Sequence, residues 1–450
     1  MTIYKKIPII LCVILLLTGC DFMLKPQEIN VKDTVFTEYE TMVDALLEIE
    51  DVHEISDYLY LWGQTKGLTA ELDRRGIVVL ESWPLSGENR EFITLECEFS
   101  VENRQEDLRS VAFALAFIQN SSVTGPIRLL MVPYSPGNHF GADHLNSKYL
   151  TSPLIKLNTK SPSEIIISEA GSWEANIHRN IKSVVPKYPF AYEISIGGIT
   201  SSIPLVNDSD IPNAIKQIGD FLATCKSNGM ILELALVQGE THFMPETGEY
   251  SSTSSAIIII TQNDLRKLEN MMIDLQNQIE NEYSKIYPNI SVVFTEVDMP
   301  PKVFSLEDTD RIISFLYTIF DGHYDFESQT MSLITSLSAE NDRFNSSLLW
   351  WSDSDVAFQE MSKDLDVITN LNDMNYDLIS RRAGWHGNPE LPWINKLLES
   401  TKSPPQTTIV PSSLAIYQQR DSELEMVSFG VDLKDCEKQW KILSSFLEKQ

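Results

Sequence analysis

The order of strands and helices predicted between Ala191 and Val297 constrains the fold of this chain more than any other feature. A strand, a helix, two strands, a helix and a strand follow one another there, as "AYEISIGGI", "DIPNAIKQIGDFLATCKSN", "MILELALVQG", "SSAIIIITQ", "NDLRKLENMMIDLQNQIENEYSKI" and "ISVVFTEV". The second helix has its apolar residues at helical spacing, and Pro288 ends it. This β-α-β-β-α-β order is that of the ferredoxin-like sandwich, so we expect such a domain at 189–300.

The segments on both sides of that domain also alternate between strand and helix patterns. Before it come "GIVVLES", "EFITLECEFSV", "DLRSVAFALAFIQN", "GPIRLLMVP" and "SEIIISE"; after it come "DRIISFLYTIFDG", "MSLITSLS", "SSLLWWS", "AFQEMSKDL" and "DCEKQWKILSSFLEK". This alternation predicts an α/β layered domain with a largely parallel sheet. The expected fold class is therefore α/β: an α/β/α domain in two parts, 37–188 and 301–450, with the ferredoxin-like domain inserted as a lid.

The N-terminal segment "MTIYKKIPIILCVILLLTGC" combines a basic start, a short apolar run and small residues before Cys20. The apolar run is too short to span a bilayer, and the pattern is that of a bacterial lipoprotein signal. We expect a signal peptide at 1–20 that ends at a lipidated Cys20, followed by a tether at 21–36. The protein would then be held to a membrane of the cell envelope, outside the cytoplasm, by acyl chains in the lipid bilayer. Asp21 favours the periplasmic face of the inner membrane.

The charge and the cysteines of the chain limit its partners and its chemistry. The formal net charge is −29, so nucleic acid would repel the protein, and no nucleic-acid partner is expected. Apart from the leader and the anchor, the cysteines are Cys97, Cys225 and Cys436. They allow one disulfide at most, the pairing of which stays open, and they form no zinc-binding pattern.

Several segments match one protein family in the same order along the chain. They are "TKGLTAELDRRGIVVLE", "SVAFALAFIQNSSVTGPIRLLMVP", "LIKLNTKS", "AGWHGNPELPWINKL" and "LEMVSFG", the last of them ahead of a final helix that contains Trp440. Through these segments the chain, from about Thr37 to Gln450, resembles the aminoacyl-histidine dipeptidases (Xaa-His dipeptidases, peptidase D) of the two-zinc exopeptidase family. The resemblance implies a zinc-exopeptidase-like α/β/α domain with an inserted lid.

The resemblance also implies positions for two zinc ions and a general base. Family members bind the metals with a histidine in a strand, a bridging aspartate, a glutamate, a second aspartate and a late histidine, and another glutamate is the base. The matching positions carry Glu98 for the first histidine, Ser100 for its supporting aspartate, Glu106 (beside Asp107) for the bridging aspartate, Ser135 for the base, Pro136 for the glutamate ligand and Lys160 for the second aspartate. The late histidine has no counterpart, and two substrate-binding positions fall near Ile203 and Trp351.

These replacements predict that the metal site and the base are vestigial. Proline offers no side-chain lone pair to a metal, and the charge of a lysine repels a cation. Loss of the general base alone would cost about two to four orders of magnitude in rate. We therefore expect no catalytic residue, no cofactor, and a non-catalytic lipoprotein that binds a peptide or a protein partner in the cleft between domain and lid.

The alternative is an active metallo-dipeptidase of the Xaa-His type whose zinc site has been rebuilt. In "MVPYSPGNHFGADHL", His139, Asp143 and His144 lie close together in sequence, and Glu106 could join them. The two histidines are five residues apart, which does not place them on one helical face, and "SPGN" is typical of a turn. A solvated loop is therefore the plainer interpretation of these residues.

Two other groups of residues are open to a functional interpretation. Ser135 near His139 forms a serine and histidine neighbourhood without an identifiable third member. The tryptophans could line a ligand groove or pack in the core; they are Trp350, Trp351, Trp385 and Trp393.

Overall fold

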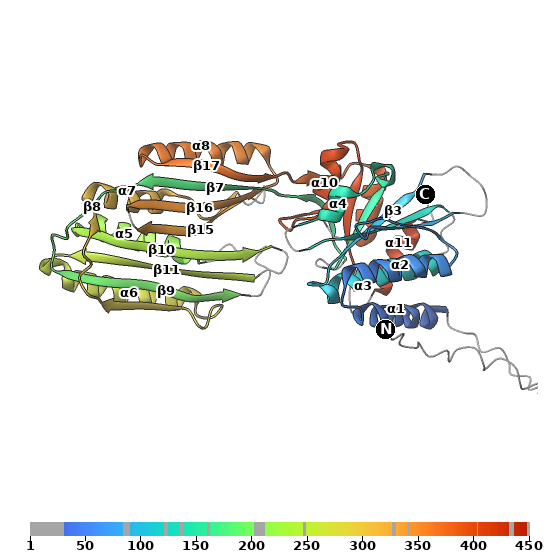
Figure 1. Ribbon diagram of the computed structural model, residues 1–450, viewed down its shortest axis with the longest axis horizontal. Helices are drawn as coiled ribbons and strands as arrows, with labels where there is room; N and C mark the ends of the chain where they lie inside the picture. The colour runs from blue at the N-terminus through green and yellow to red at the C-terminus, as the bar shows by residue number, and fades with distance from the viewer. Residues whose placement is uncertain are drawn as a thin grey trace, which may run out of the picture.

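The chain forms two lobes, an α/β domain and an elongated inserted domain (Figure 1). The computed structural model describes residues 31–83, 91–120, 125–135, 138–159, 163–201, 212–245, 249–325, 330–340, 342–402, 404–431 and 436–447. The predicted signal peptide with Cys20 lies outside these residues, as does Asp21. None of the helices in the described part of the chain is long and apolar enough to cross a membrane.

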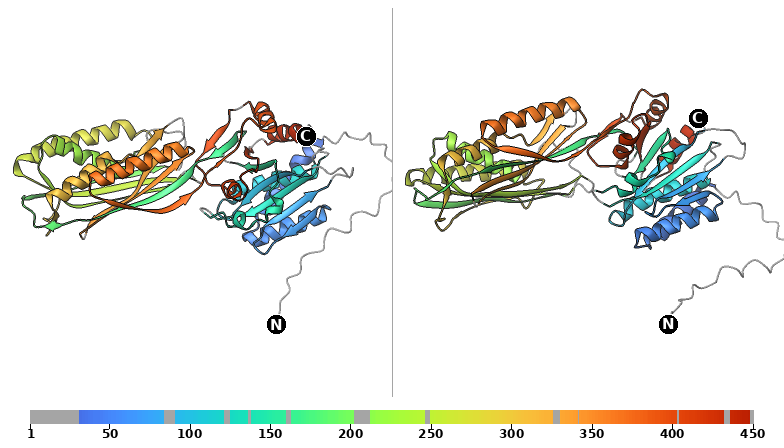
Figure 2. Two further views of the ribbon diagram at one scale, coloured as in Figure 1. Left: turned by 90° about the horizontal axis from the view of Figure 1, so that it is seen from above. Right: turned by 45° about the horizontal axis from the view of Figure 1, so that its top comes forward.

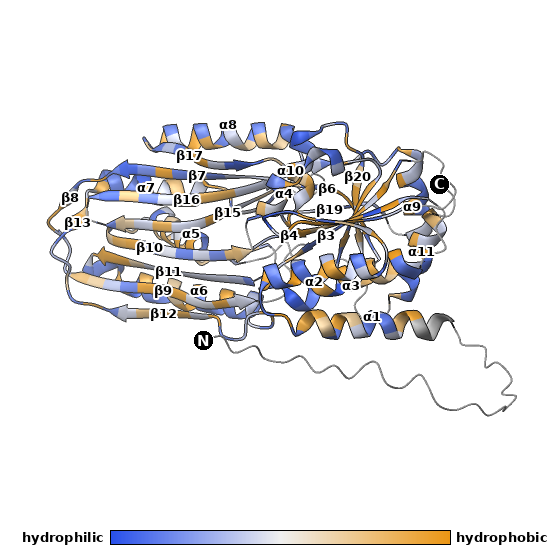
Figure 3. Cartoon of the chain, turned by 45° about the vertical axis from the view of Figure 1, so that its right-hand side comes forward, coloured by the Kyte–Doolittle hydropathy of each residue, from blue (hydrophilic) through white to orange (hydrophobic). Residues whose placement is uncertain are grey.

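The α/β domain is built on a mixed sheet with the strand order β1-β2-β4-β3-β5-β20-β6-β18, and β19 pairs with β6. The strands are β1 Thr69–Leu72, β2 Val78–Ser82, β3 Ile93–Phe99, β4 Ile127–Pro133, β5 Leu154–Asn158, β6 Ile165–Glu169, β18 Trp385–His386, β19 Gln406–Thr408 and β20 Met426–Gly430. The central pairs β4–β3, β3–β5 and β5–β20 are parallel, as predicted, whereas the pairs nearer the edges that involve β1, β2 and β18 are antiparallel. The central strands are hydrophobic along most of their length, because helices cover both faces (Figure 3).

Helices cover the two faces of this sheet unequally. One face packs against α1 Val31–Leu47, α2 Val52–Thr65, α3 Arg104–Asn120, α9 Pro392–Thr401 and α11 Glu437–Leu447. The other packs against the short α4 Phe140–His144 and against α10 Ser413–Arg420. The expected tether 21–36 is too long, because its last six residues already belong to α1.

The inserted domain has a single sheet with the order β12-β9-β11-β10-β15-β16-β7-β17, and β14 pairs with β15. Its strands are β7 Gly171–Asn180, β9 Phe190–Ser201, β10 Leu232–Met244, β11 Glu249–Ile260, β12 Ser291–Glu296, β14 Gly322–Asp325, β15 Thr330–Glu340, β16 Arg343–Ser352 and β17 Asn375–Arg382. The short strands β8 Ser183–Val184 and β13 Val303–Phe304 pair with each other. The helices are α5 Ala214–Ser227, α6 Leu265–Tyr283, α7 Leu306–Thr318 and α8 Asp355–Leu371, all on one face (Figure 2).

This domain consists of two ferredoxin-like units side by side. The first, β9-α5-β10-β11-α6-β12, is the predicted unit. The second, β7-α7-β15-β16-α8-β17, is interrupted by the first between β7 and α7. Antiparallel pairing of β10 with β15 joins the two units into one sheet.

The predicted domain boundaries 189–300 are therefore wrong. The sheet takes strands from Gly171 to Arg382, so β15, β16 and α8 belong to the insertion and not to the second part of the α/β domain. The segments were recognised as strand and helix patterns, but they were placed in the wrong domain, because β7 lies far from β16 and β17 in the sequence.

Candidate functional site

Three charged side chains lie inside the α/β domain, on the face of its sheet that α4 and α10 cover. Glu96 and Glu98 alternate along β3, and Lys156 lies on the neighbouring β5, directly across from Glu96. Alternate residues of a strand point to the same face, so the three side chains converge. All three are buried, with relative exposures of 0%, 8% and 7% for Glu96, Glu98 and Lys156. Buried charges of this kind persist only when they are paired.

The ammonium group of Lys156 is the centre of this cluster. It forms an ion pair with Glu98, and its Nζ atom lies 3.5 Å from Oε2 of Glu96. It also donates a hydrogen bond of 2.9 Å to Oγ of Ser413, the first residue of α10. Ser413 in turn donates from Oγ to Oε1 of Glu96 at 2.7 Å, so α10 is bonded to both strands of the cluster.

His139 completes the cluster from the start of α4. Its Nδ1 atom lies 2.6 Å from Oε1 of Glu98, and its ring stacks on Tyr134 with 5.4 Å between the ring centroids. Tyr134 is held in turn, because its hydroxyl accepts a hydrogen bond from Nδ2 of Asn103. The Nε2 atom of His139 is buried without a hydrogen-bond partner among the described residues.

The charges of the cluster support one another. Burial by itself would raise the pKa of Glu98, but the charges of His139 and Lys156 outweigh it and hold that pKa below its usual value. Burial would lower the pKa of Lys156, yet Glu96 and Glu98 raise it overall. The pKa of His139 is likewise raised by Glu98 against the effect of burial. Burial raises the pKa of Glu96. Glu98 is thus a carboxylate held between the ammonium group of Lys156 and the imidazole ring of His139.

Comparison with solved structures gives a match over almost the whole chain. The aminoacylhistidine dipeptidase from Vibrio alginolyticus superposes with a TM-score of 0.73 at 17% sequence identity, covering 92% of this chain and 96% of that one. This chain has the fold of an aminoacylhistidine dipeptidase. The aminopeptidase PepT from Bacillus cereus matches with a TM-score of 0.50 at 9% identity, covering 93% of this chain and 98% of that one. No known sequence family and no curated protein matches the chain.

Within this dipeptidase fold, the residues predicted at vestigial positions are scattered. Glu98 lies in the buried cluster, whereas Glu106 is exposed on the first turn of α3. Ser100 is buried and donates from Oγ to Oδ2 of Asp107 at 3.2 Å, so Asp107, and not Glu106, is the carboxylate next to β3. Ser135 and Asn138 form an isolated antiparallel bridge after β4. Pro136, Lys160 and Ile203 lie outside the described residues.

The residues of the histidine-rich stretch lie in different environments. His139 is buried against Glu98, so a solvated loop was the wrong interpretation of this residue. Asp143 and His144 are exposed on α4. Within the described residues, no three His, Cys, Asp or Glu side chains are grouped as ligands of one metal ion.

The predicted tryptophans and cysteines belong to the core. Trp351 and Trp385 are almost fully buried, and Trp350 and Trp393 are buried as well, which confirms core packing over a ligand groove. The remaining cysteines, Cys97, Cys225 and Cys436, are all buried, and Cys97 and Cys225 are free thiols.

Sequence reasoning missed four members of the cluster. They are Glu96, Lys156, Ser413 and Tyr417, whose hydroxyl donates to Oε1 of Glu96 at 3.4 Å. A signal for two of them is present in the sequence, because "TLECEF" and "LIKLN" place charged residues inside otherwise apolar strands. A charge at such a position predicts a buried partner.

The cluster does not fit a zinc ion of the kind that the resemblance implies. Zinc takes carboxylate and imidazole ligands, but Oε1 of Glu98 is bonded to His139 and Oε2 to Lys156. An ammonium group carries the positive charge that a metal would supply, and its presence opposes a second cation. The described residues of this centre are therefore built around an internal cation.

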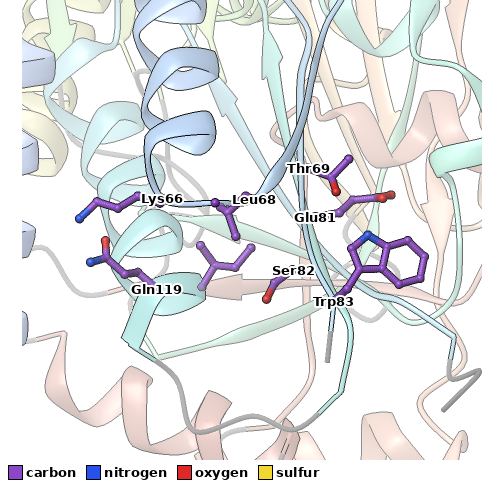
Figure 4. A pocket seen from close by; sticks show the side chains of 9 residues that line it. Lys66, Leu68, Thr69, Glu81, Ser82, Trp83 and Gln119 are labelled. Atoms are coloured by element: carbon purple, nitrogen blue, oxygen red, sulfur yellow. The ribbon is translucent and has the colours of Figure 1, made fainter. Parts of the chain in front are cut away.

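A cavity of about 310 Å³ lies elsewhere in the α/β domain (Figure 4). Residues at the ends of α2, β2 and α3 line it, among them Lys66, Trp83 and Gln119. None of its lining residues belongs to the charge cluster.

Proposed function

We propose that this protein uses a dipeptidase fold without peptidase chemistry, as a lipid-anchored envelope protein that binds a peptide or a protein partner between its two domains. The observation that carries the proposal is the ion pair of Lys156 with Glu98. Glu98 matches the first metal-binding histidine of the family, and in this chain its carboxylate is bonded on both oxygens.

The energetics of the cluster support this proposal. A metal ion would have to displace a buried ammonium group from two carboxylates and from Ser413. Removing one partner from such a buried pair typically costs about 3–5 kcal/mol. At the position matched to the general base, Ser135 has a hydroxyl group that does not accept a proton at neutral pH, in contrast to a carboxylate. These features support binding, and not hydrolysis, as the function of the protein.

The experiment is a paired measurement of metal content and turnover. The protein is purified without chelator, zinc is measured by mass spectrometry, and Xaa-His dipeptides are offered as substrates, with an active aminoacylhistidine dipeptidase as the positive control. We expect substoichiometric zinc and no hydrolysis above the buffer rate. Stoichiometric zinc together with turnover that a chelator abolishes would contradict the proposal.

The second candidate is a metallo-dipeptidase with a rebuilt zinc site. One observation favours it: Nε2 of His139 is buried and has no hydrogen-bond partner, so it could accept a metal. The variant His139→Asn distinguishes the two candidates. Loss of both bound zinc and turnover in this variant would favour the metallo-dipeptidase.

The lipid anchor is tested separately. Metabolic labelling with a palmitate analogue, followed by detergent partitioning, is compared between the full chain and Cys20→Ser. We expect Cys20→Ser to carry no label and to no longer partition into the detergent phase. Membrane fractionation then tests the inner membrane, which Asp21 favours.

A further inference from the structure

The chain crosses between its two domains twice, at adjacent places (Figures 1 and 2). It leaves the α/β domain between β6 and β7 at Ala170, and it returns between β17 and β18 at Ala383 and Gly384. β6 pairs with β18 and β7 pairs with β17, so both crossings belong to one antiparallel ribbon. A two-stranded ribbon has little stability of its own and can bend or twist.

The two backbones touch at the crossing. A Cβ atom on Gly384 would lie 2.0 Å from the carbonyl oxygen of Glu169 and 2.6 Å from the nitrogen of Gly171. A Cβ atom on Gly171 would lie 2.9 Å from the nitrogen of Gly384. Neither Gly171 nor Gly384 has room for a side chain. No side chain of these two residues holds the domains at a fixed angle, so the angle depends on the contacts that flank the crossing.

Glu169 makes those contacts. It is the last residue of β6 and is fully buried. Its carboxylate forms an ion pair with Arg382, the last residue of β17 in the inserted domain. It also accepts hydrogen bonds from Nε1 of Trp385 at 3.1 Å and from Oγ of Ser412 at 2.6 Å, both in the α/β domain. One buried carboxylate therefore bonds the end of the inserted domain to two elements of the other domain.

We propose that the Glu169–Arg382 pair is a latch that fixes the orientation of the inserted domain, with Glu169 as a positioning residue. Ser412 caps the start of α10, and its neighbour Ser413 is bonded to Lys156 and Glu96. The latch is thus one residue away from the buried charge cluster. When the carboxylate is neutralised, Arg382 loses its counterion and the ribbon is free to bend.

The experiment measures the distance between the two domains in the full folded chain. Spin labels are attached to the exposed positions Asp57→Cys on α2 and Glu360→Cys on α8, and the distance distribution is recorded by pulsed electron paramagnetic resonance. The test variant is Glu169→Gln. The matched control is Glu174→Gln, because Glu174 on β7 accepts a hydrogen bond from Ser380 on β17, which lies within the inserted domain.

We expect a broadened and shifted distribution in Glu169→Gln and an unchanged one in Glu174→Gln. Circular dichroism confirms that each variant is folded. If Glu169→Gln does not fold, Trp385→Phe removes one hydrogen bond to the latch while keeping most of the buried volume, and a smaller broadening is expected. A folded variant with the wild-type distribution, or equal broadening in the control, would overturn the proposal.

Discussion

The ammonium group of Lys156 is paired with the carboxylate of Glu98 inside the α/β domain, at the position where the sequence resemblance predicts a metal ligand. Both side chains are more than nine-tenths buried. Breaking the pair is therefore expected to destabilise the protein.

Lys156→Met should destabilise the protein by about 3–5 kcal/mol, because it leaves Glu98 and Glu96 without their shared cation. Urea unfolding followed by fluorescence measures the loss. The control is Lys66→Met, because the ion pair of Lys66 with Glu38 is partly exposed and should be worth less than about 1 kcal/mol. Equal losses of stability in the two variants would show that the buried pair stabilises the protein no more than the exposed one.

His139→Asn should cost more stability in mild acid than in base. The folded-state pKa of His139 is raised, so the stability from its pair with Glu98 is complete below about pH 6.5 and is lost as the pH rises through the raised pKa. A charged hydrogen bond of this kind is worth about 2 kcal/mol. Unfolding of both proteins at about pH 6 and about pH 9 checks this; a cost that does not fall with pH would contradict it.

The wild-type protein should lose stability as the pH rises toward neutral, and Asp321→Asn should not. Removal from water raises the pKa of the Asp321 carboxyl to about 7. Its unfolded value is about 4, so the folded state binds the extra proton and stability falls as the pH rises from about 4 to about 7. Asparagine still accepts the hydrogen bond from the Ile334 nitrogen. We therefore measure the thermal midpoints of the variant and the wild type at about pH 5 and about pH 8, on either side of the raised pKa. The midpoint of the variant relative to that of the wild type should be higher at the upper pH.

Gly384→Ala should destabilise the crossing between the domains by at least about 1 kcal/mol, because the added methyl group meets backbone atoms that cannot rotate away. The matched control is Gly125→Ala, whose Cβ atom has no neighbour within 4 Å. Urea midpoints of the two variants test this. Equal midpoints would mean that the two backbones at the crossing separate readily.

The first ferredoxin-like unit could be predicted because its six elements are consecutive and each shows its own periodicity. The second could not, because β7 finds its partners β16 and β17 only after the whole first unit has been inserted between them. The same limit applies to the site. Glu98 was singled out from a resemblance, but its partner Lys156 is on another strand and was not recognised within the matching segment "LIKLNTKS".

The sequence by itself determined the local elements, the alternation of strands and helices, and the dipeptidase-like order of segments, because these depend on residues within a few turns of one another. Only the tertiary structure decided which strands share a sheet, where the inserted domain begins and ends, and that Lys156 and His139 lie on either side of Glu98. The physical reason is that strand pairing and the pairing of buried charges join residues that are far apart in the sequence. A buried lysine is tolerated only when folding brings carboxylates to it, and here those carboxylates come from another strand.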